Sequence, residues 1–178
     1  GMGSSASLFH LYTHGIFKAG LFLTAGSVIH YLHHQKATHH ADAQSLTNMG
    51  GLRKQLPLSF IAYAIFGAGM LGIPFTSGFY SKENIAGFLC DSAQHSTYAI
   101  YYYVLLGALA VGMMLTATYM CRQIYLVFLG QNRGGHTLDK SKTDWLQIIP
   151  ISLLIFLSLF FWISLNPMDA HESVFLSF

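Results

Sequence analysis

A chain of 178 residues with 53% hydrophobic and only 9% charged residues carries a net charge of +2 at pH 7. Soluble globular domains have about 25% charged residues, so this composition excludes a soluble domain and indicates an integral membrane protein. The small net charge gives no reason to expect a nucleic-acid partner.

The first apolar segment, residues 7–30, organises the chain. As a helix rising about 1.5 Å per residue, it is long enough to cross a hydrocarbon core about 30 Å thick. His10, His14 and Lys18 recur every four residues, so they follow one helical stripe, and His30 closes the segment. Ionisable side chains are costly at membrane depth and by default mark an ion or proton path. The alternative is a set of buried groups that bond to carbonyls, carboxylates and neighbouring helices.

The polar loop at residues 31–56 contains two pairs of adjacent histidines, His33–His34 and His39–His40. Histidine-rich tracts can bind transition metals. Such pairs are also ordinary in solvated loops, and we assign no metal to this chain.

An uncharged segment follows at residues 57–73. Pro57 is well placed in the first turn of a helix. Gly67 and Gly69 would let a neighbouring helix approach closely.

The next segment, residues 76–91, is short and polar for a regular membrane span. Because Pro74 and Gly78 precede Lys82 and Glu83, we predict a discontinuous segment with its break between Gly78 and Lys82. Irregular backbone persists at membrane depth only where it is buried in protein or lines water. The alternative is a surface loop with an ordinary pair of neighbouring charges.

Two further apolar segments lie at residues 98–129 and 145–165. The first carries one charge, Arg122, which is close enough to one end to reach the membrane interface. Tyrosines at its other end fit an interfacial aromatic belt. The sequence therefore predicts an all-α membrane protein with about five transmembrane segments in residues 1–165, one of them discontinuous, and a short tail at residues 166–178.

Lys and Arg residues do not orient the predicted bundle, because residues 31–56 and 130–144 carry three each. Cys90 and Cys121 lack metal-ligand spacing and indicate no disulfide framework. We find no phosphate-binding loop, CxxC motif or Ser–His–Asp arrangement, so we assign no catalytic residue and no cofactor site.

Four stretches together resemble consecutive blocks of one family, in order and spacing: HLYTHGIFKAGLFLTAGSVIH, MGGLRKQLP, GIPFTSGFYSKENI and TATYMCRQIYLVFLG. They are similar to the chain 5 subunit family of mitochondrial NADH–quinone oxidoreductase, respiratory complex I. The resemblance implies the fold of the antiporter-like subunits, which also occurs in multisubunit sodium/proton antiporters.

The resemblance implies a proton relay at six positions: His10, His14, Lys18, His30, Lys82 and Glu83. In the family, the lysine matching Lys18 belongs to a central hydrophilic axis, and the two histidines that precede it connect to that axis. The histidine matching His30 lies near an exit from the bilayer. The lysine matching Lys82 is a terminal relay residue at the break of a discontinuous helix, and an acid follows it.

The implied function is therefore that of a non-redox, proton-translocating subunit in the membrane arm of complex I. FMN and iron–sulfur clusters would belong to other subunits. We expect lipids, other membrane-arm subunits and a neighbouring antiporter-like subunit as partners, in the mitochondrial inner membrane or, as the alternative, a bacterial inner membrane. A complete family member is much longer, so we expect this chain to be a fragment whose missing N-terminal part is a further partner.

Three other functions stay open. The chain could belong to a multisubunit sodium/proton antiporter, or it could be a structural piece of the membrane arm that no longer transports. The least favoured alternative is a metal transporter built on the histidine loop. The presence of His14, Lys18 and Lys82 favours transport over a structural role.

Overall fold

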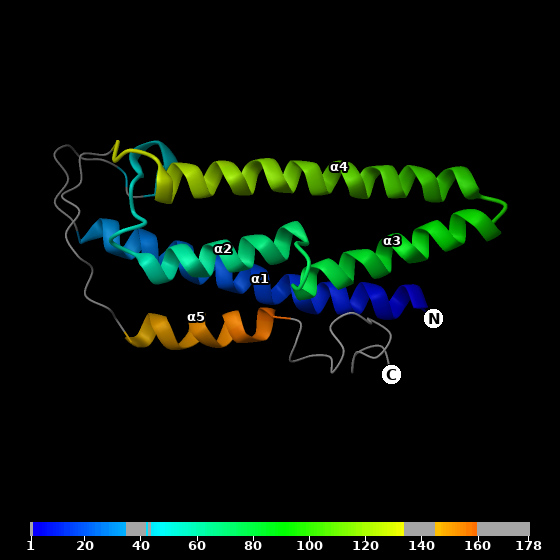
Figure 1. Cartoon of the computed structure of the whole chain (residues 1–178), viewed down its shortest axis with the longest axis horizontal. Coiled ribbons are helices and arrows are strands. Elements are labelled where there is room, and N and C mark those ends of the chain that lie inside the picture. Colours follow the sequence, from blue (N-terminus) through cyan, green and yellow to red (C-terminus); the bar gives the residue numbers. More distant parts are fainter. Residues whose placement is uncertain (1, 35–41, 43, 134–144, 160–178) are drawn as a thin grey trace. The chain divides into compact units, whose positions relative to one another are not determined.

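The computed structural model describes residues 2–34, 42, 44–133 and 145–159 (Figure 1). Within these residues the regular structure is helical, which confirms the predicted all-α class. Its elements are α1 (Met2–His33), the 3-10 helix η1 (Leu46–Asn48), α2 (Pro57–Leu71), α3 (Ser77–His95), α4 (Ala99–Ile124), the π-helical turn η2 (Tyr125–Leu129) and α5 (Trp145–Ser158).

Two helical stretches are long and apolar enough to cross a membrane, Ser7–His33 and Ala99–Leu129, and α2 and α5 are shorter apolar helices. The apolar window of the second long stretch is only 6% buried within the chain, whereas that of the first is 44% buried. The surface of α4 is therefore left for lipid or for other helices. The five predicted crossings, and the boundaries drawn for them, stay predictions.

The helices pack as two compact units. The first comprises Gly1–Phe17, Ala68–Ala117 and Phe156–Phe178, and the second comprises Lys18–Gly67 and Thr118–Ile155. Because α1, α2, α4 and α5 each contribute residues to both units, neither unit corresponds to a continuous stretch of chain.

The core of the second unit brings the end of α1 together with the loop before α2 and with η2. Its buried apolar members are Val28, Tyr31, Leu32, Met49, Leu52, Leu56, Val127 and Phe128. The backbone N–H groups of Leu52 and Arg53 donate to the carbonyls of Val127 and Phe128, at 3.3 and 3.2 Å. These carbonyls lie at the end of a helix, where intrahelical donors run out, so the loop supplies the missing partners.

A buried serine joins three helices of the same unit. The hydroxyl of Ser27 on α1 donates to Oε1 of Gln147 on α5 at 2.8 Å, and it lies 3.3 Å from the hydroxyl of Ser59 on α2. Since buried polar groups need partners, these bonds fix how the three helices meet.

In the first unit, α2 and α3 are separated by a break at residues 72–76, where Gly72 has a φ of +74° (Figure 1). The predicted break between Gly78 and Lys82 is wrong, because α3 is continuous through those residues. Gly78 instead serves a close approach: a Cβ there would collide with the carbonyl of Gly69 on α2. A glycine needed for contact looks the same in the sequence as a glycine needed for a kink.

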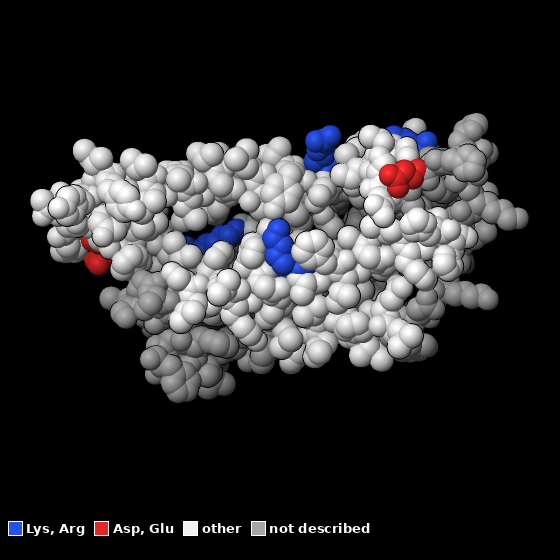
Figure 2. All heavy atoms as spheres, turned by 180° about the vertical axis from the view of Figure 1, so that it is seen from behind, with Lys and Arg blue, Asp and Glu red and all other residues white. Residues whose placement is uncertain are grey.

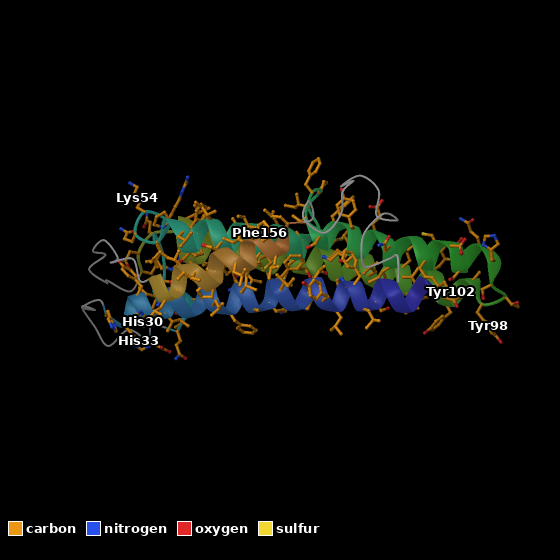
Figure 3. All side chains as sticks on the ribbon, turned by 90° about the horizontal axis from the view of Figure 1, so that it is seen from below. His30, His33, Lys54, Tyr98, Tyr102 and Phe156 are labelled. Carbon is orange, nitrogen blue, oxygen red and sulfur yellow. The ribbon has the colours of Figure 1, made fainter. Side chains whose placement is uncertain are left out.

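A short turn at residues 96–98 joins α3 to α4. Tyr98 and Tyr102 lie together where α4 begins (Figure 3), and Tyr98 is exposed. The face drawn in Figure 2 carries few Lys, Arg, Asp and Glu side chains, separated by broad uncharged surface. Both observations agree with an aromatic end and an apolar flank in a membrane.

Candidate functional site

A cluster of polar side chains lies inside the first unit, where the N-terminal part of α1 meets α3. Its members are His10, Thr13, Ser77, Ser81 and Lys82. Thr13, Ser77 and Ser81 are 0% exposed, and His10 and Lys82 are half-buried. His10 and Thr13 are three residues apart on α1, and Ser77 and Ser81 are four apart on α3, so each pair shares one face of its helix.

Hydrogen bonds connect this cluster across the two helices. Nδ1 of His10 lies 3.1 Å from Oγ of Ser81. The hydroxyl of Thr13 donates to the carbonyl of His10 at 3.1 Å, and it lies 3.4 Å from Oγ of Ser81. The hydroxyl of Ser81 donates to the carbonyl of Gly78 at 3.1 Å. His10 is therefore held in place by a hydroxyl of the facing helix.

Ser77 uses its hydroxyl differently. It donates to the carbonyl of Ser158 at 2.9 Å, next to a single antiparallel bridge between Thr76 and Leu159. Ser77 thus ties the start of α3 to the end of α5.

The amine of Lys82 binds the end of α2. It donates to the carbonyl of Met70, which lies in the last turn of that helix. The last carbonyls of a helix have no intrahelical partner and carry the negative end of its dipole. The break that begins at Gly72 leaves this end of α2 open to the lysine, so the break creates a binding position for a cation.

Two further titratable groups complete the surroundings of His10. His14 follows one turn later on α1, and the centroids of the two imidazole rings are 5.7 Å apart. Both His14 and Lys82 interact electrostatically with His10. The structure therefore brings together three of the six predicted relay residues: His10, His14 and Lys82. Glu83 is exposed and forms no ion pair with a described residue.

Lys18 and His30 belong to the second unit, and both are exposed. Among the described residues, Lys18 has no hydrogen-bond or ion-pair partner. The ring of His30 lies 4.5 Å from that of His34, centroid to centroid. Figure 3 shows His30 and His33 near the C-terminal end of α1, with Lys54 at the same end of the view. A charged side chain on an apolar helix is costly at membrane depth unless its charge is compensated.

The structure describes only part of the histidine loop at residues 31–56. His33 and His34 are exposed at the end of α1, while His39 and His40 lie outside the described residues, as does the predicted tail at residues 166–178. Where the structure is described, no three His, Cys, Asp or Glu side chains are grouped so as to hold a metal ion. The two thiols are free.

Reasoning from the sequence misses Thr13, Ser77 and Ser81. Serine and threonine are common in membrane helices, where their hydroxyls bond to the backbone of the preceding turn, so their presence alone carries little information. The available signal is the spacing of Ser77 and Ser81 immediately before Lys82. It becomes informative only once α1 and α3 are known to pack together.

Comparison with known proteins gives one family. Residues 1–92 match the family model described as NADH:quinone oxidoreductase/Mrp antiporter, TM. The chain is similar to NADH-quinone oxidoreductase subunit L of Pseudomonas aeruginosa, with 37% identity over 169 residues, which cover 94% of this chain and 24% of that protein.

Two mitochondrial-type relatives show the same pattern. NADH-ubiquinone oxidoreductase chain 5 of Acanthamoeba castellanii is 37% identical over 158 residues, covering 88% of this chain and 22% of the relative. Chain 5 of Metridium senile is 35% identical over 158 residues, covering 88% and 24%. The resemblance to chain 5 is thereby confirmed. The chain spans about a quarter of the length of the curated relatives it matches.

Proposed function

Because the chain belongs to the NADH:quinone oxidoreductase/Mrp antiporter transmembrane family, we propose that it is a proton-translocating part of the membrane arm of respiratory complex I. The observation that carries this proposal is the polar cluster of the first unit. There His10 is bonded to buried Ser81, and the neighbouring Lys82 is bonded to the end of α2. Ionisable groups are expensive inside a membrane protein, so their concentration at one place indicates a path for protons.

In this proposal the relay consists of six residues: His10, His14, Lys18, His30, Lys82 and Glu83. His10, His14 and Lys82 form one station inside the first unit. Lys18 and His30 lie in the second unit, and Lys18 is exposed there. In this proposal Lys18 exchanges protons with a group on a neighbouring helix of another subunit. Histidine is the residue type whose free imidazole changes charge near neutral pH, which suits it to pass protons on.

Other subunits of the complex would supply the redox centres and the remaining helices of the membrane arm. Electron transfer from NADH to quinone is assigned to other subunits, which carry FMN and iron–sulfur clusters, so this chain would be a non-redox subunit of an oxidoreductase. Its partners would be other membrane-arm subunits, including the N-terminal portion that longer relatives possess and a neighbouring antiporter-like subunit. Lipids would cover the exposed apolar side of α4. We place the chain in a mitochondrial inner membrane, with a bacterial inner membrane as the alternative, since relatives of both kinds match.

Replacement of Lys82 by Met tests the relay. Methionine keeps the length and flexibility of the side chain and removes the amine. We expect the Lys82→Met variant to lower the number of protons that the assembled complex moves per NADH oxidised, measured in proteoliposomes. Lys54→Met is the matched control, because Lys54 is exposed in the turn before α2. A proton-to-NADH ratio unchanged by Lys82→Met would reject the relay and favour the structural role.

The family description also covers antiporters, and the composition of the purified complex separates the two functions. We expect the chain to co-purify with subunits that carry FMN and iron–sulfur clusters, identified by mass spectrometry and by their absorbance. Co-purification with antiporter subunits alone, together with sodium-dependent proton exchange, would replace complex I by a sodium/proton antiporter.

A further inference from the structure

The hydrogen bonds around Ser81 bear on which ring nitrogen of neutral His10 carries the hydrogen. A serine hydroxyl has one hydrogen to donate and two lone pairs with which to accept. The carbonyl of Gly78, 3.1 Å from Oγ, can only accept, so it takes the hydroxyl hydrogen. This bond back to the preceding turn is the usual one for a serine within a helix. Only lone pairs of Ser81 then remain for Nδ1 of His10, which lies 3.1 Å away.

The third neighbour, Thr13, is consistent with the same assignment. Its single hydroxyl hydrogen is shared between the carbonyl of His10 at 3.1 Å and Oγ of Ser81 at 3.4 Å, so neither contact takes the hydrogen of Ser81. Thr13 and Ser81 are both 0% exposed, so water does not replace these bonds within the chain. While the hydroxyl hydrogen of Ser81 is on the carbonyl of Gly78, the contact between Ser81 and the imidazole is a hydrogen bond only if Nδ1 of His10 bears a hydrogen.

We propose that Ser81 is a positioning residue that holds neutral His10 as the Nδ1–H tautomer, so that Nε2 is the atom that takes up and releases a proton. The role of that proton rests on the proposed function, whereas the tautomer does not. The Nδ1–H bond to Ser81 is the same in the neutral imidazole and in the imidazolium. His10 therefore gains and loses a proton at Nε2 without turning its ring or breaking its bond to α3.

Two titratable groups act on His10 from the helices packed around it, His14 on α1 and Lys82 on α3. Whether His10 is charged at a given pH depends first on its burial and then on the charges of these two neighbours. Which nitrogen is bare in the neutral ring depends on Ser81. The two properties are therefore separable by measurement.

Solid-state NMR of the full chain in lipid bilayers, labelled with nitrogen-15 histidine, measures the tautomer directly. The His10 signals are identified by their loss in the His10→Gln variant. At a pH where the ring is neutral, we expect Nδ1 to be protonated and Nε2 to be bare. Ser81→Ala removes the acceptor, and we expect the ratio of the two tautomers to shift towards Nε2–H by about two- to tenfold, the effect of one ordinary hydrogen bond.

Ser77→Ala is the matched control. Ser77 is one turn earlier on the same helix, is equally buried, and bonds to the carbonyl of Ser158 rather than to His10. We expect the control to leave the His10 tautomer unchanged. The inference is overturned if His10 of the unmodified chain is the Nε2–H tautomer. It is also overturned if Ser81→Ala leaves the ratio unchanged, or if Ser77→Ala shifts it equally. Proton translocation by the assembled complex is measured separately. If His10 has the expected tautomer but the complex does not translocate protons, the proposed function is rejected and the tautomer assignment stands.

Discussion

At the scale of single residues, Lys18 and Lys82 differ in what compensates their charge. The amine of Lys82 bonds to the open end of α2, whereas Lys18 is exposed and has no hydrogen-bond or ion-pair partner among the described residues. Both were predicted as relay residues from the family resemblance. Their compensation could not be predicted, because it depends on a helix end and on surfaces that lie far away in the sequence.

This difference predicts the outcome of Lys18→Met. A lysine at the centre of a membrane helix costs about 2.5–3.5 kcal/mol on insertion scales, so its removal does not weaken the insertion of α1. Methionine is also as good a helix former as lysine. We therefore expect the complex to assemble normally, by native gel electrophoresis, and to move fewer protons per NADH oxidised. Normal translocation would remove Lys18 from the relay, and loss of assembly would show that its charge is structural.

At the scale of elements, the helices were largely predictable and their contacts were not. Long apolar runs gave the positions of α1 and α4, and Pro57 marked the start of α2, because local composition and backbone chemistry decide those features. The position of the break was missed, because Gly78 is needed for packing against Gly69 rather than for a kink. The contacts of Arg133 were not predictable either. Its guanidinium donates to the carbonyls of Leu46, Thr47 and Leu126, and the first two, on η1, are remote in sequence.

The contact of α3 with α2 predicts opposite effects for two Gly→Ala changes on α3. A Cβ at Gly78 would meet the backbone carbonyl of Gly69, which cannot rotate away, so we expect Gly78→Ala to destabilise the protein by about 1–3 kcal/mol. Gly87 has open space around it, and Gly87→Ala should stabilise α3 by up to about 1 kcal/mol through helix propensity. Thermal unfolding in detergent, followed by circular dichroism, measures both. Equal effects of the two changes would contradict the close approach of α2 and α3.

At the scale of the whole molecule, the described residues contain few ion pairs. The ion pair found in the described part of the chain joins His95 to Asp91, and both side chains are exposed on α3. Neither Lys18 nor Lys82 has a carboxylate partner there. Only 6% of the apolar window within Ala99–Leu129 is buried inside the chain. Both features are those of a part that is completed by other helices.

We therefore expect the isolated chain to insert into liposomes without translocating protons. A proton path needs groups that accept and release protons in sequence across the bilayer, and the exposed amine of Lys18 has no hydrogen-bond or ion-pair partner among the described residues. The measurement is the rate of internal acidification, reported by a pH-sensitive dye, compared per molecule with liposomes that contain the assembled complex. Protein-free liposomes and liposomes with the Lys18→Met chain are the controls, and we expect all three rates without the complex to be the same. A rate for the isolated chain that approaches that of the complex would contradict this, and a difference from the Lys18→Met chain would show that Lys18 already has its partner within the chain.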